Sequence, residues 1–157
     1  MAGVSLYGDW LRLKAQLKKL ELESTDTKRL NKRIAVYIRE ATQDRFDAQQ
    51  SPEGEAWEPL APATIEKRMK KSGSEGGGEM NILVDSSTLK GSLTIKALSY
   101  GAAVGTNEVY AAIQQAGGKT GRGQQVDIPA RPYLGVSKED SKEIMAIIEE
   151  FAEEMSV

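Results

Sequence analysis

The sequence predicts an α+β fold, in which a small, mostly antiparallel sheet is packed against long helices from the N-terminal and C-terminal parts of the chain. Two observations lead to this prediction. Apolar residues recur at helical spacing near both ends of the chain, whereas residues 92–106 alternate apolar and polar side chains, as strands do. The 157 residues are near the usual size of one domain, so we expect a single domain.

The first third of the chain carries two helical patterns. Residues 6–20 place large apolar side chains at alternating spacings of four and three residues, which is typical of a helical seam, and their other face is basic. The segment ESTDT interrupts this pattern, and a second helix is predicted over 27–49. We expect residues 1–25 to be a helical extension that can pair with the second helix as an antiparallel hairpin. The two seams are Leu6, Trp10, Leu13, Leu17 and Leu20, then Leu30, Ile34, Tyr37 (or Ile38), Ala41 and Phe46.

The next segment alternates turn signals with short elements. Pro and Gly in SPEGEAW mark a turn, and residues 61–71 are predicted to form a short helix that tolerates Pro62 in its first turn. The Gly-rich composition of residues 72–79 predicts a flexible loop. The apolar run at 81–84 predicts a short strand.

Two further strands are predicted on either side of a turn near residues 99–101, because apolar and polar residues alternate there. Leu93, Ile95 and Ala97 would form their buried face. A short helix is expected over 108–117, and the glycine that ends it suits a left-handed helix cap.

The last part of the chain is predicted to contain a flexible loop at 117–125, a brief strand at 126–128 and a long helix. Ser137 begins this helix, and Asp140, three residues later, completes a pair that resembles a capping box. The helix is expected to be acidic on its exposed side. Its buried side would consist of Ile144, Ile147, Ile148 and Phe151.

The composition argues against most enzyme chemistries. The chain has no histidine and no cysteine, which removes the commonest general base, the commonest metal ligand and all thiol chemistry. The segment GGKTGRG is no phosphate loop, because that motif requires a glycine five positions before Gly118, where Ile113 stands. No catalytic constellation is visible in the sequence, and an enzyme that uses lysine or carboxylate groups stays open as an alternative. No apolar run is long enough for a signal peptide or a membrane span, which predicts no membrane association and a reducing cytoplasm.

The charge balance also argues against a dedicated nucleic-acid binder, since the formal net charge is only −2. A nucleic-acid-binding adaptor nevertheless stays open as an alternative, with non-specific proximity to DNA. Its basic side chains would be Lys67, Arg68, Lys70, Lys71, Lys119 and Arg122.

The segment VDIPARPYLGVSKED predicts a stiff corner before the last helix. Pro129 and Pro132 fix their own φ angles and restrict the residues before them to extended conformations, so Arg131 is held in a rigid frame. Its guanidinium can bind carbonyls or carboxylates as a fork. Two interpretations stay open: Arg131 serves assembly, or it only ties down backbone at a helix entry. Tyr133 and Leu134 would pack into the core beneath the corner, and Gly135 would let the chain turn into the helix.

Four blocks of the sequence resemble the phage virion morphogenesis family, the tail-completion proteins of contractile-tailed phages and related prophages. In order they are RFDAQQSPEGEAWEPLAPATIEKR, ILVDSSTLKGSL, AAVGTNEVYAAIQQAG and IPARPYLGVS, and the resemblance spans about residues 30–150. The chain departs from the family pattern at a few positions. Gln114 stands in place of a histidine, Ala116 in place of an aromatic residue, Ser87 in place of a glycine and Tyr133 in place of phenylalanine. Any chemical role of that histidine is therefore lost here.

This resemblance implies a structural virion protein, not an enzyme, that completes the tail and joins it to the head without a cofactor. It implies phage tail and neck proteins as partners, a homo-oligomeric ring that is often sixfold, assembly in the host bacterial cytoplasm and a final place at the head–tail junction. A small phage accessory or inhibitor protein is a further alternative. The interaction candidates are Arg131, Tyr133, Lys119, Arg122, Gln114 and Gln115, and the structural candidates are Trp57, Gly105, Tyr110, Pro129, Pro132 and Leu134.

Overall fold

The computed structural model describes residues 24–72, 81–85 and 87–155. The predicted helix over 6–20 and most of the loop predicted at 72–79 lie outside these residues. The α+β class is confirmed. In chain order the elements are α2 (Ser24–Ala48), α3 (Pro62–Ser72), α4 (Thr88–Gly91), β1 (Thr94–Leu98), β2 (Gly101–Gly105), α5 (Ala111–Ala116), β3 (Gly118–Thr120), the 3-10 turn η1 (Arg122–Gln124), β4 (Val126–Ile128) and α6 (Lys138–Met155).

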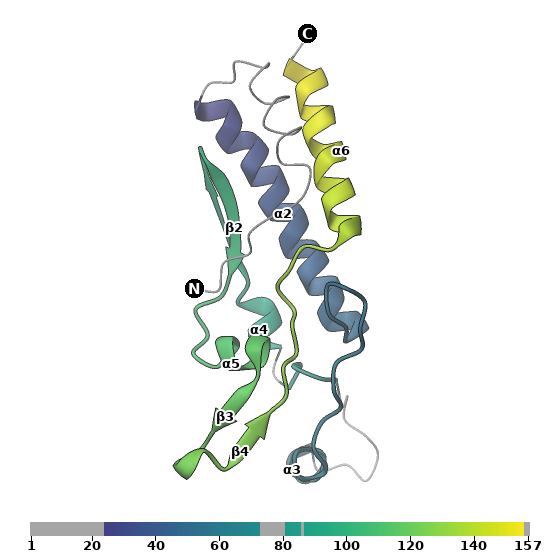
Figure 1. Cartoon of the computed structure of the whole chain (residues 1–157), viewed down its shortest axis with the longest axis vertical. Helices are drawn as coiled ribbons and strands as arrows, with labels where there is room; N and C mark the ends of the chain where they lie inside the picture. The colour runs from purple at the N-terminus through teal and green to yellow at the C-terminus, as the bar shows by residue number, and fades with distance from the viewer. Residues whose placement is uncertain (1–23, 73–80, 86, 156–157) are drawn as a thin grey trace.

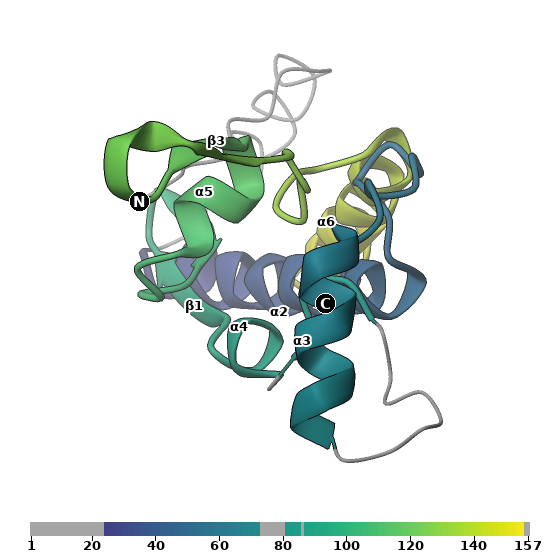
Figure 2. The same ribbon diagram turned by 90° about the horizontal axis from the view of Figure 1, so that it is seen from below.

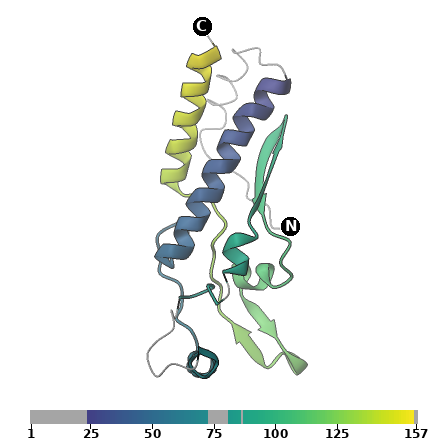
Figure 3. The ribbon, with the colours of Figure 1, turned by 180° about the vertical axis from the view of Figure 1, so that it is seen from behind.

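The two long helices α2 and α6 lie side by side and run in opposite directions (Figures 1 and 3). They share a core because each buries one apolar stripe, as their sequences predict. From α2 this core receives Leu30 and Ile34, and from α6 it receives Ile144, Ile148 and Phe151.

The β1–β2 hairpin packs against α2 (Figure 1). The strands are antiparallel, with Leu98 opposite Gly101, so residues 99 and 100 form the turn that the sequence predicts. Asn31 of α2 donates a hydrogen bond from Nδ2 to the backbone oxygen of Leu98 at 2.7 Å. This bond ties the end of β1 to the first half of α2.

A second core lies at the C-terminal end of α2 and is centred on three aromatic rings. Phe46 meets Trp57 edge-on, with ring centroids 5.6 Å apart, and it meets Tyr133 at 5.2 Å. Such tilted aromatic pairs stabilise a core beyond the area that they bury. Leu89 and Leu134 are buried in the same cluster.

The helix predicted over 61–71 is confirmed as α3, with Pro62 in its first turn. Figure 1 shows α3 end-on below the long helices, and Figure 2 shows that it extends away from the body. Arg68, in the second half of α3, ties the helix to the following segment by donating from Nη1 to the backbone oxygen of Asn81 at 2.8 Å.

The strand predicted at 81–84 is wrong, because this segment is a turn with Leu83 at φ 62°. Side chains bind the backbone groups that a neighbouring strand would have paired. The backbone nitrogen of Ile82 donates to Oε1 of Gln49 at 2.9 Å, while Arg68 binds the preceding carbonyl. The apolar character of the run is satisfied by burial of Ile82 in the aromatic core. The short helix α4 that follows was not predicted.

The loop predicted at 117–125 is also wrong in part, because it contains β3 and η1. β3 pairs with β4 in an antiparallel register, Gly118 opposite Ile128 and Thr120 opposite Val126. The expected single sheet is therefore two separate hairpins in the part of the chain that the structure describes. Three consecutive residues are too few to give a strand pattern in a sequence rich in glycine. The strand at 126–128 is confirmed.

Candidate assembly site: a clamped corner and a projecting hairpin

The corner that precedes α6 is held by side chains from segments far away in the sequence. Gln115 of α5 accepts hydrogen bonds on Oε1 from the backbone nitrogens of Tyr133, at 3.0 Å, and Leu134, at 2.9 Å. Its Nε2 donates to the backbone oxygen of Leu134 at 2.8 Å. Trp57 donates from Nε1 to the backbone oxygen of Pro132 at 2.8 Å. One amide and one indole therefore satisfy four backbone polar groups of this extended segment.

Arg45 of α2 clamps the corner from the other side. Its Nη1 donates to the backbone oxygens of Tyr133, at 3.2 Å, and Gly135, at 2.9 Å. Its Nη2 forms an ion pair with Asp140, and both side chains are less than a tenth exposed. The pair is buried and Arg45 makes further hydrogen bonds to backbone oxygens, which is the arrangement in which an ion pair tolerates removal from water.

Asp140 connects this clamp to the start of α6. Its Oδ2 accepts from the backbone nitrogen of Ser137 at 2.6 Å, and its own backbone nitrogen donates to Oγ of Ser137 at 3.0 Å. The predicted capping box is confirmed. Tyr37 also donates from its hydroxyl to Oδ1 of Asp140 at 3.1 Å. Burial is the larger cause and this hydrogen bond to the carboxylate is the second, and together they raise the pKa of Tyr37 to about 12.

Arg131 lies in the corner itself and binds the backbone of a loop that is distant in the sequence, residues 58–59. Its Nε donates to the backbone oxygen of Glu58 at 3.0 Å, and its Nη2 donates to that of Pro59 at 3.1 Å. Burial lowers the pKa of Arg131, and the residue is 6% exposed. The predicted fork to carbonyls is confirmed. Of the two interpretations of Arg131, these contacts favour the one in which it ties down backbone.

Two glycines in this region are required by close packing. A side chain at Gly135 would place its Cβ 2.4 Å from Cγ of Pro52, and one at Gly117 would place it 2.7 Å from the backbone nitrogen of Ala130. Gly117 also has φ 69° and ends α5, as the sequence predicts. The corner, α5 and the turn around Pro52 therefore fit together without space for a methyl group.

The β3–β4 hairpin projects from the corner at the end of the molecule opposite the N-terminal end of α2 and the C-terminal end of α6 (Figure 1). All residues from 118 to 127 are exposed. The predicted interaction residues Lys119 and Arg122 lie on this hairpin, and Lys119 is opposite Asp127 in the strand register. The hairpin thus exposes mostly polar residues together with Val126, and it is attached to a corner whose residues Tyr133 and Leu134 are buried.

The other predicted site residues are distributed around the corner. Tyr133 and Leu134 are buried, and Tyr110 at the start of α5 is 42% exposed. Gly105 ends β2, where its backbone oxygen accepts from Oγ1 of Thr94 at 3.2 Å. Among the described residues, the buried Oε1 of Gln114 has no hydrogen-bond partner, whereas the backbone oxygen of Gln114 accepts from the nitrogen of Arg131 at 2.7 Å. Pro129 and Pro132, predicted to stiffen the corner, are both half-buried within it.

The basic residues of the nucleic-acid alternative do not form one patch. Lys67 and Lys70 are exposed on α3, and Lys70 pairs with Glu66 at 2.6 Å. Arg68 is engaged with Asn81, whereas Lys119 and Arg122 lie on the hairpin, which Figure 2 shows well separated from α3.

Sequence reasoning did not single out Arg45, which binds the corner. Gln115, predicted as an interaction residue, also binds the corner, and its role in assembly stays a prediction. Arg45 directly precedes Phe46 of the apolar stripe of α2. A charged residue beside such a stripe is the signal that could have pointed to Arg45. Within the described residues, no cluster of three or more carboxylates is arranged to hold a metal ion, and none of the helices is long and apolar enough to cross a membrane.

Comparison with known proteins identifies the family. The phage virion morphogenesis family matches residues 9–152, which is most of the chain. The protein belongs to the phage virion morphogenesis family. The predicted resemblance is confirmed, and with it a structural role in phage morphogenesis.

Two relatives from Haemophilus influenzae support this assignment. The Mu-like prophage FluMu G protein 1 is 30% identical over 145 residues, which cover 89% of this chain and 88% of the relative. The Mu-like prophage FluMu G protein 2 is 48% identical over 69 residues, which cover 44% of this chain and only half of the relative's length. No solved structure is detectably similar.

The four blocks that carry the family resemblance converge at the corner. Arg45, Trp57 and Pro59 come from the first block and Gln115 from the third, and all four contact the last block. Leu89 of the second block is buried in the same core cluster as Leu134 of the last. The four blocks of the family pattern thus meet in one tertiary feature, the corner from which the β3–β4 hairpin projects.

Proposed function

We propose that this member of the phage virion morphogenesis family completes the tail and joins it to the head, as a structural component that stays in the particle. Family membership supports a morphogenesis role. The observation that carries the finer proposal is the contrast between a densely hydrogen-bonded corner and the exposed hairpin attached to it. A joining protein needs a base that fixes geometry and a surface that remains available to a partner.

In this proposal the β3–β4 hairpin docks on tail or neck proteins, and copies of the chain associate into a ring. The exposed hairpin has short strands whose outer edges can accept a further strand, and it carries Lys119 and Arg122 for acidic partners. The protein acts by stoichiometric incorporation, so its amount limits the number of joined particles.

Complementation of phage that lack this protein tests the proposal. Such phage should accumulate filled heads and separate tails, and purified protein added to the extract should restore infectivity in proportion to its amount, with saturation at a fixed number of copies per tail. If trace protein rescued many tails per copy, or if finished particles contained none, the structural role in joining would be wrong.

Hairpin variants in the same assay locate the docking surface. The double variant Lys119→Glu and Arg122→Glu should lose joining while it keeps its circular dichroism spectrum and its melting temperature. Lys67→Glu with Lys70→Glu on α3 is the matched control, because it reverses the same charge on another exposed element. Equal loss with both variants would indicate a general effect of net charge, as expected of a nucleic-acid-binding adaptor, rather than docking by the hairpin.

A further inference from the structure

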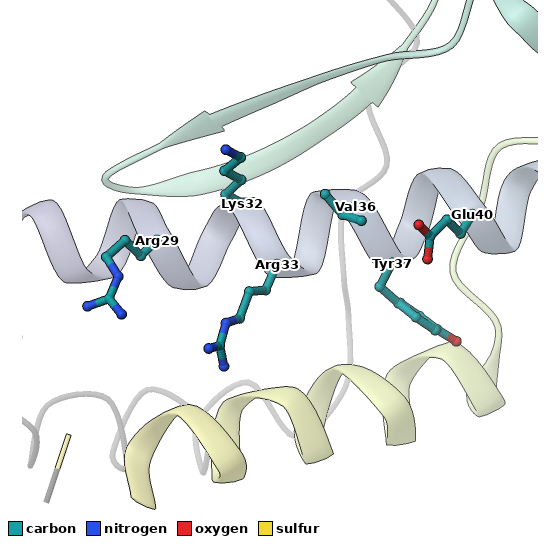
Figure 4. Close-up of a pocket in the computed structure, with 6 residues that line it drawn as sticks. All are labelled: Arg29, Lys32, Arg33, Val36, Tyr37 and Glu40. Carbon is teal, nitrogen blue, oxygen red and sulfur yellow. The ribbon is translucent and has the colours of Figure 1, made fainter. Parts of the chain in front are cut away.

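The outward face of α2 carries a groove of about 480 Å³. The described residues that line it all belong to α2, and they are drawn in Figure 4: Arg29, Lys32, Arg33, Val36, Tyr37 and Glu40. Spacings of four, three and four separate residues 29, 33, 36 and 40, so these four lie along one face of the helix. Figure 4 shows that α6 borders this face on one side and the β1–β2 hairpin on the other.

The exposed charged side chains of α2 are divided between the two halves of the helix. The cations lie in the N-terminal half: Lys28, Arg29, Lys32 and Arg33. The anions lie in the C-terminal half: Glu40, Asp44 and Asp47. The half-buried Val36 separates the two groups. The outer face of α2 therefore changes from positive to negative along its length.

This distribution is unfavourable for α2 by itself. Arg29 and Arg33 are like charges four residues apart, and so are Glu40 and Asp44. Arg33 reaches toward α6 in Figure 4 and is compensated there by Glu154 at 2.8 Å. The two anions, by contrast, form no ion pair with any described residue. A partner that brought cations to this half of the face would therefore relieve an existing repulsion.

The charges on this face are arranged symmetrically. The two arginines and the two anions that form no ion pair follow one another at spacings of four, seven and four residues, and their midpoint lies between Val36 and Tyr37. A twofold axis through this midpoint lays a second α2 antiparallel on the first. Arg33 then faces Glu40 of the second copy, and the outer arginine faces the outer anion in the same way. Because the contact is isologous, each of these pairings occurs twice.

Other occupants would match only half of the face. A nucleic acid or an acidic peptide would be attracted by Arg29 and Arg33 but repelled by the anions, and a basic segment would meet the reverse problem. A second copy of α2 matches both halves at once. The centre of the contact would be formed by Val36 and the ring of Tyr37 with charges around them, as is usual for protein interfaces. Residues 29 to 44 span about 22 Å of helix, which gives the pairing its length.

We propose that two copies of the chain pair through this face with their α2 helices antiparallel, so that Arg33 of each copy faces Glu40 of the other. Arg29 of each copy faces Asp44 of the other. This twofold pair differs from a ring, whose contacts join two different surfaces of the chain. It places the two β3–β4 hairpins at opposite ends of the dimer and leaves them uncovered. The pairing concerns the free protein and does not depend on the proposed role in joining heads to tails.

Charge reversals in the full-length protein test the pairing, with the mass in solution measured by sedimentation equilibrium. The unmodified chain should form a dimer that weakens as salt is added. Arg33→Glu and Glu40→Arg each bring like charges together at two contacts, so each variant alone should raise the dimer dissociation constant at least about tenfold. Circular dichroism should show that both variants keep their fold.

Two combinations of these substitutions should restore the dimer. An equimolar mixture of the Arg33→Glu and Glu40→Arg chains should form heterodimers, because every reversed charge then meets its opposite. The double variant, which carries both substitutions in one chain, should form homodimers again. It is the matched control, since its net charge is that of the unmodified chain.

Cysteine cross-linking provides an independent measure of the register, because the chain contains no cysteine of its own. Val36→Cys lies beside the proposed axis and should give a disulfide-linked dimer under mild oxidation. Gln43→Cys is the matched control, because its two thiols would be roughly 20 Å apart along the helices. We expect the first variant to cross-link at least about tenfold faster.

Four results would overturn the proposal. A monomer at every concentration would mean that the face is covered in another way or is left free. Equal cross-linking at the two cysteine positions would contradict the register, and a mixture of the charge variants without heterodimers would contradict the pairing of opposite charges. Oligomers that resist both charge reversals would show that copies associate through another surface, a result that would leave the proposed joining role intact.

Discussion

The corner and the β3–β4 hairpin are adjacent in the chain but are built in opposite ways. The corner is extended backbone whose polar groups are bound by Arg45, Trp57 and Gln115, from three separate segments. The hairpin satisfies its backbone by pairing with itself and exposes every residue from 118 to 127. The comparison indicates that one segment fixes the local structure and another is available to partners. The hydrogen-bonded backbone of the corner resists movement, whereas the exposed residues of the hairpin can be substituted without loss of the fold. The predictions below test this division, from the largest expected effect on stability to the smallest.

Removal of the Arg45 guanidinium should be the most damaging change. Arg45→Met leaves Asp140 buried without its cation and leaves the carbonyls of Tyr133 and Gly135 without this donor. Breaking a buried pair by removing one partner costs about 3–5 kcal/mol of unfolding free energy. Chemical denaturation measures the loss. The control Arg33→Ala breaks an exposed ion pair with Glu154 and should cost far less; equal losses would show that the corner is not a special site.

Two neighbouring glutamines should behave differently. Gln115→Ala leaves two backbone nitrogens and one oxygen of the corner without partners, and we expect a loss of about 1–3 kcal/mol. Gln114→Ala removes a buried oxygen that has no partner, so its cost should be much smaller or absent. Thermal or chemical melts of the two variants provide the test. Similar losses would contradict the role of Gln115 as the clamp.

The link between Tyr37 and Asp140 should appear as a dependence of stability on pH. The pKa of Tyr37 is raised to about 12 in the folded protein, above its ordinary value of 10.0. Because the folded state favours the neutral phenol, this contribution is complete below pH 10.0 and is lost as the pH rises through about 12. Tyr37→Phe should lower stability at neutral pH by about 1 kcal/mol, the value of one hydrogen bond. It should also flatten the decline in the alkaline range; an unchanged slope would exclude Tyr37 as its source.

Substitutions in the hairpin should have the smallest effect on stability. Lys119→Glu with Arg122→Glu changes exposed side chains on a segment outside both cores, so the unfolding free energy should change by less than about 0.5 kcal/mol. The same variant should abolish joining in the complementation assay. A large loss of stability would show that the hairpin is part of the folded core and would remove the distinction between the two regions.

Hydrogen exchange sharpens the comparison without any mutation. The sequence predicts that residues 117–125 exchange quickly in the free protein, and the exposed, short β3–β4 pairing is consistent with rapid opening. The amides of Tyr133 and Leu134, bound by Gln115, should exchange slowly. Strong protection of the hairpin in the free monomer would contradict the predicted flexibility of residues 117–125.

Local information in the sequence was sufficient for the long elements. The apolar stripes of α2 and α6, the β1–β2 hairpin, the glycine that ends α5 and the capping box at Ser137 all depend on residues a few positions apart. Such features can be recognised because helix and strand periods and cap chemistry act over one or two turns of chain. The stiffness of the corner followed from its two prolines for the same reason.

Only the tertiary structure decided which side chains bind the corner and which secondary structure the short segments adopt. Arg45 and Asp140 are 95 positions apart, and Arg131 and Glu58 are 73 apart, so neither pairing leaves a local pattern. The strand expected at 81–84 became a turn because Gln49 and Arg68 bound its backbone, and β3 formed because β4 was available beside it. Short segments take the partner that folding brings to them, since three or four residues contribute too little free energy to fix their own conformation.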